Sequence, residues 1–335
     1  MKLGVDTYSI RSQGWDAFGY LDYSKKIGLD IVHFSDMGSF ASLETPYLRE
    51  VKAHADELGL LIEAGMGSIC PTSTTFRPAR GTAVEQVERM LDIAVELGSP
   101  VLRCFLGSSA DRRTDLPLEA HIQSTIDTCL AVKAKCRDTG VKLALENHAG
   151  DLQGRELREL VERAGPDTVG VCIDNGNPLW TLEDPLVTLE HLGPYTVTSH
   201  IRDTSAWAHP RGAAVQWVAM GDGNTGLDAF INEYKRVCAD VPVTLEIITG
   251  GAPRVLPYLE PDFWGPYKGV LAHEFARFEK LVREGQPFIG TMLTATQNPE
   301  LPDEYRAALV AQQRVDLERS VQYCKQVHQL GESQP

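Results

Sequence analysis

LALENH, residues 143–148, is a short apolar run that ends in a carboxylate and a histidine, and three later segments repeat this pattern. VCIDNGN (171–177), VTSHIRD (197–203) and VTLEII (243–248) are also apolar runs that end in polar side chains. The metal-binding side chains at these ends are Glu146, Asp174, His200 and Glu246. A divalent cation needs three or four oxygen or imidazole ligands from different directions, and strand ends in an α/β barrel supply them. The pattern therefore predicts a metal site and an enzyme.

Eight short apolar segments, including these four, have the composition of strands. They are residues 2–8, 30–36, 60–66, 100–106, 141–148, 168–174, 196–203 and 241–248. Amphipathic stretches between most of them predict outer helices, at residues 16–27, 46–58, 83–97, 118–139, 153–164 and 226–239. The chain thus alternates strand and helix.

Four glycines support the boundaries of these units. Gly28, Gly59, Gly98 and Gly140 each stand just before a predicted strand, where a left-handed helix C-cap is expected. An open doubly wound sheet would also alternate strand and helix, but it would gather ligands at one switch point rather than on four successive strands. We therefore expect an α/β fold, a (β/α)8 TIM barrel with a C-terminal aromatic-rich insertion and a terminal helix.

The chain of 335 residues fits one large domain with appendages. We assign residues 1–250 to the barrel core. Residues 251–300 are rich in glycine, proline and aromatics and are interpreted as an insertion that forms a lid or a subunit contact. Residues 301–335 are interpreted as a long amphipathic helix and a frayed tail, as part of the same domain.

Charge and composition exclude several classes of partner. The 46 acidic and 32 basic side chains give a net charge of −14, which repels a polyanion, so no nucleic-acid partner is expected. No apolar stretch reaches the roughly 18–20 residues that span a bilayer, and the N-terminus lacks a signal-peptide pattern. The seven cysteines form no CxxC pair. These features predict a cytoplasmic protein with reduced thiols and no membrane association.

Strand parity places candidate side chains inside the barrel, since residues two apart share a face. Glu146 and His148 therefore point inward together; His148 either orients Glu146 or transfers a proton. Asn177 follows the tight turn DNGNP and is expected to turn back toward the site. The competing interpretations are a helix cap for Asp174 and a buried structural histidine for His200.

An inward carboxylate at Glu246 needs a charge partner or a metal, because an unpaired buried charge is costly. Arg103 on strand four is a candidate to bind a substrate oxygen or to neutralise the carboxylates. Arg202 shares a face with His200 and is a further substrate-binding candidate. His33, Glu63, Asp203 and Trp264 are candidates to line the cavity.

At LENH, IDNGN, HIRD and the late LEI, the sequence resembles the xylose isomerase-like TIM barrel superfamily of sugar phosphate isomerases and epimerases. The resemblance covers about three quarters of the chain, from the first predicted strand through TLEII. It implies a metal quartet of Glu146, Asp174, His200 and Glu246. It also implies that Glu146 and Glu246 exchange the substrate proton.

One departure from the family pattern concerns the substrate site. Ketose epimerases of this group carry a histidine three residues after the metal-binding aspartate, where this chain has Asn177. His148 is a histidine at a different position and joins Glu146 and Glu246 as a candidate catalytic residue. The aromatic insertion also departs from the smallest members, and such segments occur in relatives that are lyases.

Two enzymatic hypotheses share the same first step. The first is a divalent-metal-dependent sugar isomerase or epimerase that abstracts a proton next to a carbonyl through a metal-stabilised enediolate. The alternative is a lyase or dehydratase that eliminates a β-substituent from an oxidised sugar, as in 3-oxo-glycoside cleavage. A noncatalytic carbohydrate-binding barrel is a third hypothesis. DNA phosphodiester hydrolysis is disfavoured by the net charge and by the small number of histidines.

An oxygen-rich site with one imidazole predicts Mn²⁺, with Mg²⁺ or Co²⁺ as alternatives. No Gly-rich phosphate-binding loop is apparent, which favours an unphosphorylated ligand. We expect a small-molecule sugar substrate. We also expect a homo-oligomer or a complex with a smaller subunit.

Overall fold

The computed structural model describes residues 1–294 and 301–331. Within those ranges it contains one parallel sheet of eight strands in the order β10-β1-β2-β3-β4-β5-β6-β7. Their bounds are β1 Leu3–Asp6, β2 Ile31–Phe34, β3 Leu61–Ser68, β4 Val101–Phe105, β5 Lys142–Glu146, β6 Val169–Asp174, β7 Thr196–His200 and β10 Val243–Leu245. All eight coincide with predicted strands, which confirms the expected TIM barrel.

The barrel is closed between its first and last strands in the sheet order. The Ile201 N–H donates to the Thr244 carbonyl at 2.8 Å, and the Glu246 N–H donates to the Ile201 carbonyl at 2.9 Å. These two hydrogen bonds join the end of β7 to β10. Because the strands are parallel, their carboxyl ends form one rim, where active sites of such barrels lie.

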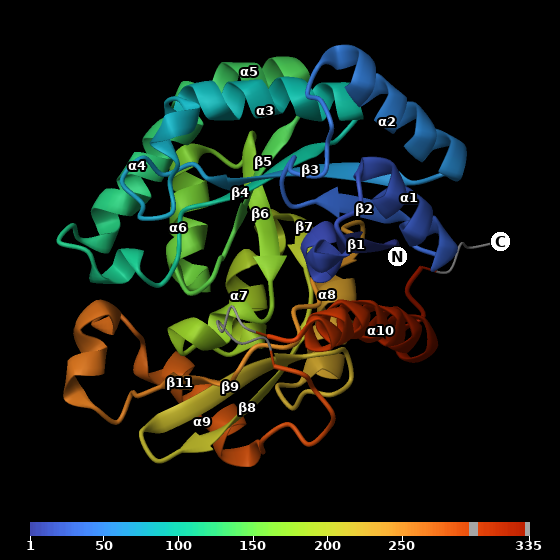
Figure 1. Cartoon of the computed structure of the whole chain (residues 1–335). Helices are drawn as coiled ribbons and strands as arrows, with labels where there is room; N and C mark the ends of the chain where they lie inside the picture. Colours follow the sequence, from blue (N-terminus) through green and yellow to red (C-terminus); the bar gives the residue numbers. More distant parts are fainter. Residues whose placement is uncertain (295–300, 332–335) are drawn as a thin grey trace.

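Helices cover the outside of the barrel (Figure 1). The described helices are α1 Ala17–Lys26, α2 Thr45–Leu58, α3 Ala83–Leu97, α4 Leu118–Ala131, α5 Lys133–Thr139, α6 Gly154–Ala164, α7 Pro185–Leu192, α8 Leu227–Val237, α9 Ala272–Glu284 and α10 Asp303–His328. Gly59, Gly98 and Gly140 end α2, α3 and α5 in the left-handed conformation that the sequence predicted. Helix α7 was not predicted, although Asp184 caps it and Pro185 occupies its first position.

A second, smaller layer lies below the barrel in Figure 1. It is a three-stranded antiparallel sheet in the order β11-β9-β8, made of β8 Asp203–His209, β9 Gly212–Val218 and β11 Arg254–Leu256. Helix α9 packs on β8, and the aromatics that the sequence placed in the insertion form a separate core there. Its buried members are Leu179, Leu182, Ala206, Ala213, Val215, Leu256, Tyr258, Phe263, Tyr267, Phe278 and Val282.

The β8–β9 hairpin corrects the predicted end of strand seven. The expected strand 196–203 ends at His200, and Asp203 begins the hairpin instead. The Asp203 carboxylate accepts hydrogen bonds from the backbone N–H groups of Gly221 and Gly223 at 3.0 and 2.9 Å, which ties the two ends of the hairpin together. The extra layer therefore starts about fifty residues before the predicted insertion.

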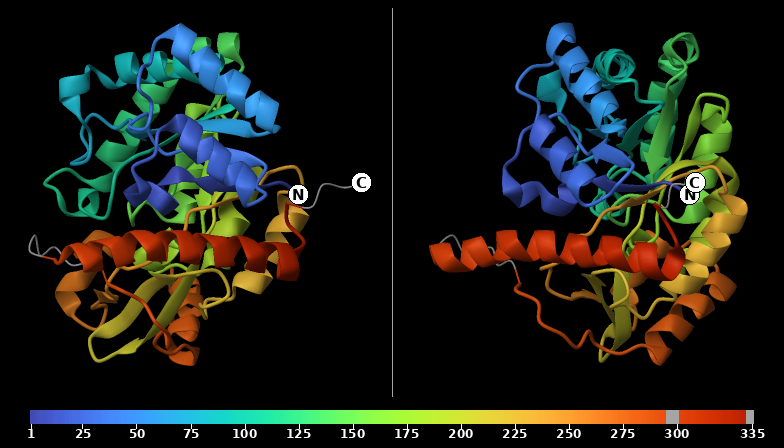
Figure 2. Two further views of the ribbon diagram at one scale, coloured as in Figure 1. Left: turned by 45° about the vertical axis from the view of Figure 1, so that its right-hand side comes forward. Right: turned by 90° about the vertical axis from the view of Figure 1, so that its right-hand side faces the viewer.

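Helix α10 passes between the barrel and the small sheet in both views of Figure 2. Its second half is anchored, since the Ser320 hydroxyl accepts from the Met220 N–H at 3.1 Å. The Gly331 N–H donates to the Met1 carbonyl at 3.1 Å, so the end of the helix lies beside the start of the chain. Residues 295–300 and 332–335, which belong to the predicted insertion and tail, lie outside the described residues.

Glu183 is a buried carboxyl group between α6 and α7. It accepts a hydrogen bond from the Gly154 N–H at 2.9 Å and another from the Thr188 hydroxyl. Burial raises its pKa from 4.5 to about 7, and these hydrogen bonds oppose the rise only in part. The folded protein therefore holds this proton more tightly than the unfolded chain does.

Glu183→Gln is expected to remove a pH dependence of stability. The carboxyl stabilises the fold most below pH 4.5, and this contribution is lost as the pH rises to about 7. Over that interval the free energy of unfolding of the variant, minus that of the wild type, should increase by up to about 3 kcal/mol. Urea unfolding of both proteins at pH 5 and pH 8 measures the difference. A difference independent of pH would contradict this account.

Candidate metal centre

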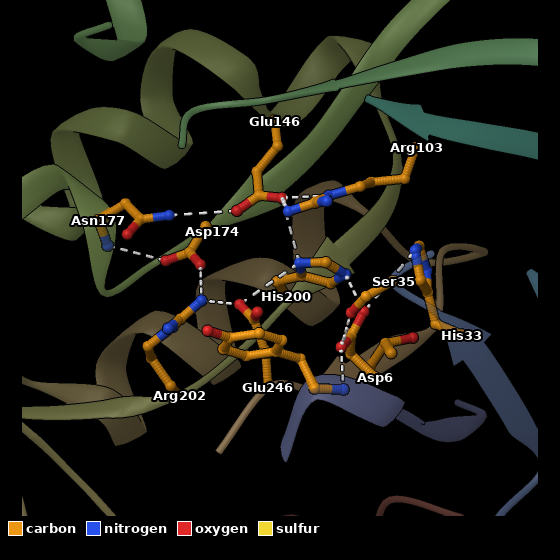
Figure 3. A network of polar contacts seen from close by, with 12 residues as sticks. Asp6, His33, Ser35, Arg103, Glu146, Asp174, Asn177, His200, Arg202 and Glu246 are labelled. Atoms are coloured by element: carbon orange, nitrogen blue, oxygen red, sulfur yellow. Dashed lines mark hydrogen bonds and ion pairs between the residues drawn. The ribbon is translucent and has the colours of Figure 1, made fainter. Parts of the chain in front are cut away.

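Four side chains predicted from the sequence converge at the carboxyl ends of neighbouring strands (Figure 3). They are Glu146 at the end of β5, Asp174 at the end of β6, His200 at the end of β7 and Glu246 directly after β10. One ligand atom from each lies within 4.8 Å of the ligand atoms of the other three. All four residues are buried, with exposed fractions of at most 5%. The structure thus brings the expected quartet together.

The donor set of this quartet fits a divalent cation. The Nδ1 atom of His200 lies 3.2 Å from a Glu146 oxygen and 3.5 Å from a Glu246 oxygen. Neither ring nitrogen of His200 makes a hydrogen bond within the described residues, although both are buried. Three carboxylates around one imidazole form the oxygen-rich site that Mn²⁺ or Mg²⁺ prefers, and a buried cation would balance their charge.

Two arginines neutralise the carboxylates in this structure. Arg103 on β4 donates from Nε to Glu146 at 2.5 Å, and Arg202 contacts both Asp174 and Glu246. Burial opposes ionisation of Glu146, but Arg103 and His200 outweigh burial and hold the pKa of Glu146 well below its usual value. For Asp174 burial dominates and raises the pKa despite Arg202. The sequence predicted Arg103 to be inward-facing, and it is.

The small sheet supports Arg202 through a stack of four planar groups. The Arg202 guanidinium lies 4.4 Å from the ring centroid of Trp217, which belongs to β9. Trp217 stacks on Trp180 at 4.5 Å with an interplanar angle of 8°, and Arg254 of β11 lies 4.0 Å from the Trp180 ring. Because β9 and β11 both contribute, the extra layer fixes the position of Arg202 at the rim. Sequence reasoning missed this stack.

Asn177 turns back toward the site, as its position after a tight turn predicted. Its side-chain amide donates to Glu146 at 3.2 Å, while its backbone N–H donates to Asp174 at 2.8 Å. The Gly176 N–H also donates to Asp174, at 2.6 Å. One carboxylate oxygen of Asp174 therefore accepts hydrogen bonds from both backbone N–H groups at the start of the 3-10 helix Asn177–Thr181, while the other oxygen contacts Arg202.

His148 lies at the rim but does not hold Glu146. Its ring stacks on Phe105 at 3.8 Å, and its Nδ1–H donates to the Gly107 carbonyl at 2.6 Å. Burial lowers its pKa to about 4, so the ring is neutral at pH 7 and its Nε2 is a free proton acceptor. Of the two predicted roles, orientation of Glu146 is wrong, and proton transfer stays a prediction.

Asp6 was missed by sequence reasoning. It ends β1, and its Oδ2 lies 3.2 Å from Nε2 of His200 and 3.8 Å from Nε2 of His33. His33 contacts Glu63 at 3.0 Å, and Glu63 accepts a hydrogen bond from Thr198 at 2.6 Å. A carboxylate on the far nitrogen of a ligand histidine fixes the ring and leaves the other nitrogen for the metal. The signal was present, because Asp6 also ends an apolar run.

Two of the four cavity candidates belong elsewhere. Asp203 holds the hairpin through backbone N–H groups, and Trp264 donates its indole N–H to the Tyr258 carbonyl at 2.7 Å in the small sheet's core. His33 and Glu63 lie in the buried network beneath His200.

A cleft of about 1250 Å³ opens over the quartet. Its lining includes every residue that the sequence proposed for substrate binding or proton transfer, except the deeply buried Glu146: Arg103, His148, Asn177, Arg202 and Glu246. The cleft therefore exposes Glu246 of the quartet and His148 to a substrate. No helix among residues 1–294 and 301–331 is long and apolar enough to cross a bilayer.

A TIM barrel with acidic and histidine side chains converging at its carboxyl rim defines the class of protein. The chain belongs to the xylose isomerase-like TIM barrel family, whose model matches residues 21–264. The resemblance inferred from LENH, IDNGN and HIRD is thereby confirmed.

Two of the proteins that the chain resembles are named as enzymes. The chain is 22% identical over 210 residues to 3-oxo-isoapionate decarboxylase of Pectobacterium atrosepticum, covering 61% of this chain and 69% of the relative. It is similar in fold to D-psicose 3-epimerase in the presence of D-fructose, with 14% identity, a TM-score of 0.61 and coverage of 99% and 100%. It is also similar to the IOLI protein with a bound zinc atom, with 16% identity, a TM-score of 0.57 and coverage of 84% and 96%.

Proposed function

We propose that this protein is a divalent-metal-dependent sugar isomerase or epimerase that abstracts a proton next to a carbonyl. The observation that carries the proposal is the convergence of Glu146, Asp174, His200 and Glu246 within 4.8 Å beside a large cleft. The family is described as xylose isomerase-like, and one protein of similar fold is D-psicose 3-epimerase. Both facts support sugar chemistry at this rim.

The proposed roles of the side chains follow from their surroundings. Glu146, Asp174, His200 and Glu246 would hold the cation, for which Mn²⁺ is our first choice and Mg²⁺ or Co²⁺ are alternatives. When bound, such an ion supplies Lewis-acid stabilisation of negative charge on a substrate oxygen. Arg103, Asn177 and Arg202 line the same cleft and would donate hydrogen bonds to substrate oxygens.

Three groups are candidates to move the proton. Glu246 lines the cleft and is the proposed base on one side of the substrate. Glu146, which is buried beneath the cleft, is its proposed counterpart. Nε2 of His148 is unprotonated at pH 7 and is the third candidate. A proton removed by one carboxylate and returned by another at the opposite face gives epimerisation. Return at the neighbouring carbon gives isomerisation.

The second candidate is a lyase or dehydratase on an oxidised sugar, such as a 3-oxo-glycoside. Two observations favour it: the cleft of about 1250 Å³ exceeds the roughly 300–1000 Å³ of an ordinary small-molecule pocket, and the curated relative is a decarboxylase. The proton abstraction is shared, but the electron pair then expels a substituent. A noncatalytic barrel would exchange no proton.

Proton exchange measured by NMR distinguishes these functions. The Mn²⁺-activated protein is incubated in D₂O with ketoses and 3-oxo-glycosides, the metal is removed, and ¹H spectra are recorded. We expect deuterium beside the carbonyl without loss of a substituent, and at least about 100-fold less exchange with Glu246→Gln. Release of an aglycone or water would establish the lyase. Absence of metal-dependent exchange with every compound would contradict both enzymatic proposals.

The remaining assignments are proposals about context. We propose that the small sheet and the segment 251–294 act as a lid or a subunit contact. A homo-oligomer, or a complex with a smaller subunit, would bury this layer. We also propose that the protein has no nucleic-acid partner, which its net charge of −14 supports. A cytoplasmic location and the absence of a membrane partner are further proposals.

A further inference from the structure

Three arginines that follow β3 line the cleft away from the metal quartet. Arg77 directly precedes the 3-10 helix Pro78–Arg80, Arg80 ends it, and Arg89 lies on α3. All three are exposed and all three line the cleft. In the barrel order, β3 lies opposite β7, which carries His200. The arginines and the quartet thus approach one cleft from opposite sides of the barrel.

None of these guanidinium groups forms a salt bridge among the described residues, although Arg89, after the hydrogen bonds from Thr82, contributes to lowering the pKa of Glu85. The acidic groups beside them are already engaged. Glu85 accepts hydrogen bonds from the N–H and the hydroxyl of Thr82 at 2.8 and 2.9 Å, and Asp36 accepts from the Gly38 N–H at 2.7 Å. In a chain with a net charge of −14, three arginines without a salt bridge in one cleft form a local region of positive charge.

Several exposed arginines elsewhere in the chain pair with carboxylates, although Arg11, Arg113 and Arg314 are exposed and form no salt bridge among the described residues either. Arg49 pairs with Glu96, Arg137 with Asp167, and Arg236 with Glu233. Excess carboxylates are therefore available to arginines on the outer surface. The absence of such partners at the cleft leaves positive charge available to a ligand, and a cleft focuses the field of such charges.

The backbone that carries the arginines is held in place. The Gln86 side chain donates to the carbonyls of Arg77 and Gly81 at 3.0 and 2.8 Å. The Arg80 N–H donates to the Arg77 carbonyl at 3.1 Å, which closes the 3-10 turn. Because the segment is already ordered, a ligand would order only the guanidinium ends, which lowers the entropy cost of binding.

We propose that Arg77, Arg80 and Arg89 bind an anionic group of the substrate, a phosphate ester or a carboxylate, at the outer part of the cleft. Arginine forms paired, charge-assisted hydrogen bonds with both groups. Together with the proposed function, this makes the substrate an anionic sugar whose carbonyl end lies at the quartet. The absence of a Gly-rich loop favoured an unphosphorylated ligand. Arginine side chains can bind a phosphate without such a loop, so this proposal allows a phosphorylated substrate.

Binding of two small anions tests the site independently of the sugar. Methyl phosphate and acetate are titrated into the full chain at low ionic strength and without added metal, so that phosphate does not coordinate an ion. The triple variant Arg77→Gln/Arg80→Gln/Arg89→Gln is compared with the wild type. The control triple variant, Arg49→Gln/Arg137→Gln/Arg236→Gln, removes the same charge from the outer surface.

We expect the dissociation constant of the tighter-binding anion to rise at least about tenfold in the cleft variant and to stay unchanged in the control. A preference for methyl phosphate identifies a phosphate ester, and a preference for acetate identifies a carboxylate. The proposal is overturned if neither anion binds the wild type, or if both variants lose equal affinity.

Mn²⁺ binding separates this inference from the proposed function. The cleft variant should bind Mn²⁺ as the wild type does, measured by electron paramagnetic resonance, which also shows that it folds. If the wild type does not bind Mn²⁺, the proposed function is wrong, but the anion site is unaffected. Loss of anion binding alone would remove only the anion site.

Discussion

Asp174→Asn is expected to weaken Mn²⁺ binding at least about 100-fold while leaving the metal-free protein folded. Removal of supporting groups around a metal already lowers affinity about 10- to 100-fold, and Asp174 is a proposed ligand itself. The metal-free fold tolerates the change because burial disfavours the ionised form of Asp174. Arg202 also keeps Glu246 as a partner. Titration of Mn²⁺ followed by electron paramagnetic resonance measures the affinity.

Glu183→Gln is the matched control for this prediction. It also replaces a buried carboxyl group with an amide, but Glu183 lies between α6 and α7 and contacts Gly154 and Thr188 instead of the quartet. Its Mn²⁺ affinity should equal that of the wild type. Equal losses in the two variants would mean that Asp174 affects the metal only through general stability, and the ligand assignment would fail.

Arg103→Met is expected to lower the free energy of unfolding of the metal-free protein by about 3–5 kcal/mol. Arg103 is buried and neutralises Glu146, so its removal leaves an uncompensated buried carboxylate. Mn²⁺ should restore much of this loss, because the cation would take over the neutralisation of Glu146. The variant should also bind Mn²⁺ more tightly than the wild type, since a competing positive charge is gone.

Urea unfolding with and without Mn²⁺ measures this coupling. The control is Arg49→Met, which breaks an exposed ion pair with Glu96 in which the Arg49 side chain is 69% exposed. Exposed pairs contribute about 0–1 kcal/mol, and no response to Mn²⁺ is expected for this variant. If Arg103→Met lost no more stability than Arg49→Met, or if Mn²⁺ restored none of it, the proposed charge balance at Glu146 would be wrong.

Much of the barrel and the quartet was predictable because the relevant signals are local. Each strand is a short apolar run, and a two-residue period decides which side chains face inward. The alternation of side chains along a strand was sufficient to place Glu146 and His148 on one face. The positions of Glu146, Asp174 and His200 at strand ends were sufficient to predict that they lie close together. Parallel strands share one rim, so residues far apart in the sequence meet without any knowledge of the loops.

The features that escaped prediction depend on tertiary contacts. Nothing local to Trp217 indicates that it stacks between Arg202 and Trp180, because the three come from different loops and strands. The β8–β9 hairpin follows β7 closely. The predicted strand 196–203 included the first residue of β8, and the rest of the hairpin was not predicted. Asp6 also ends an apolar run, but it belongs to the first strand, whereas the four predicted ligands lie on the last four strands.

The central claim is that the rim of the barrel holds one divalent cation in the quartet of Glu146, Asp174, His200 and Glu246. Anomalous diffraction at the manganese edge, from crystals grown with Mn²⁺, tests it most directly. We expect one strong peak at the rim, with an oxygen or nitrogen atom of each of the four side chains within about 2.0–2.5 Å. A rim without a peak, or a peak bound by other side chains, would contradict the account.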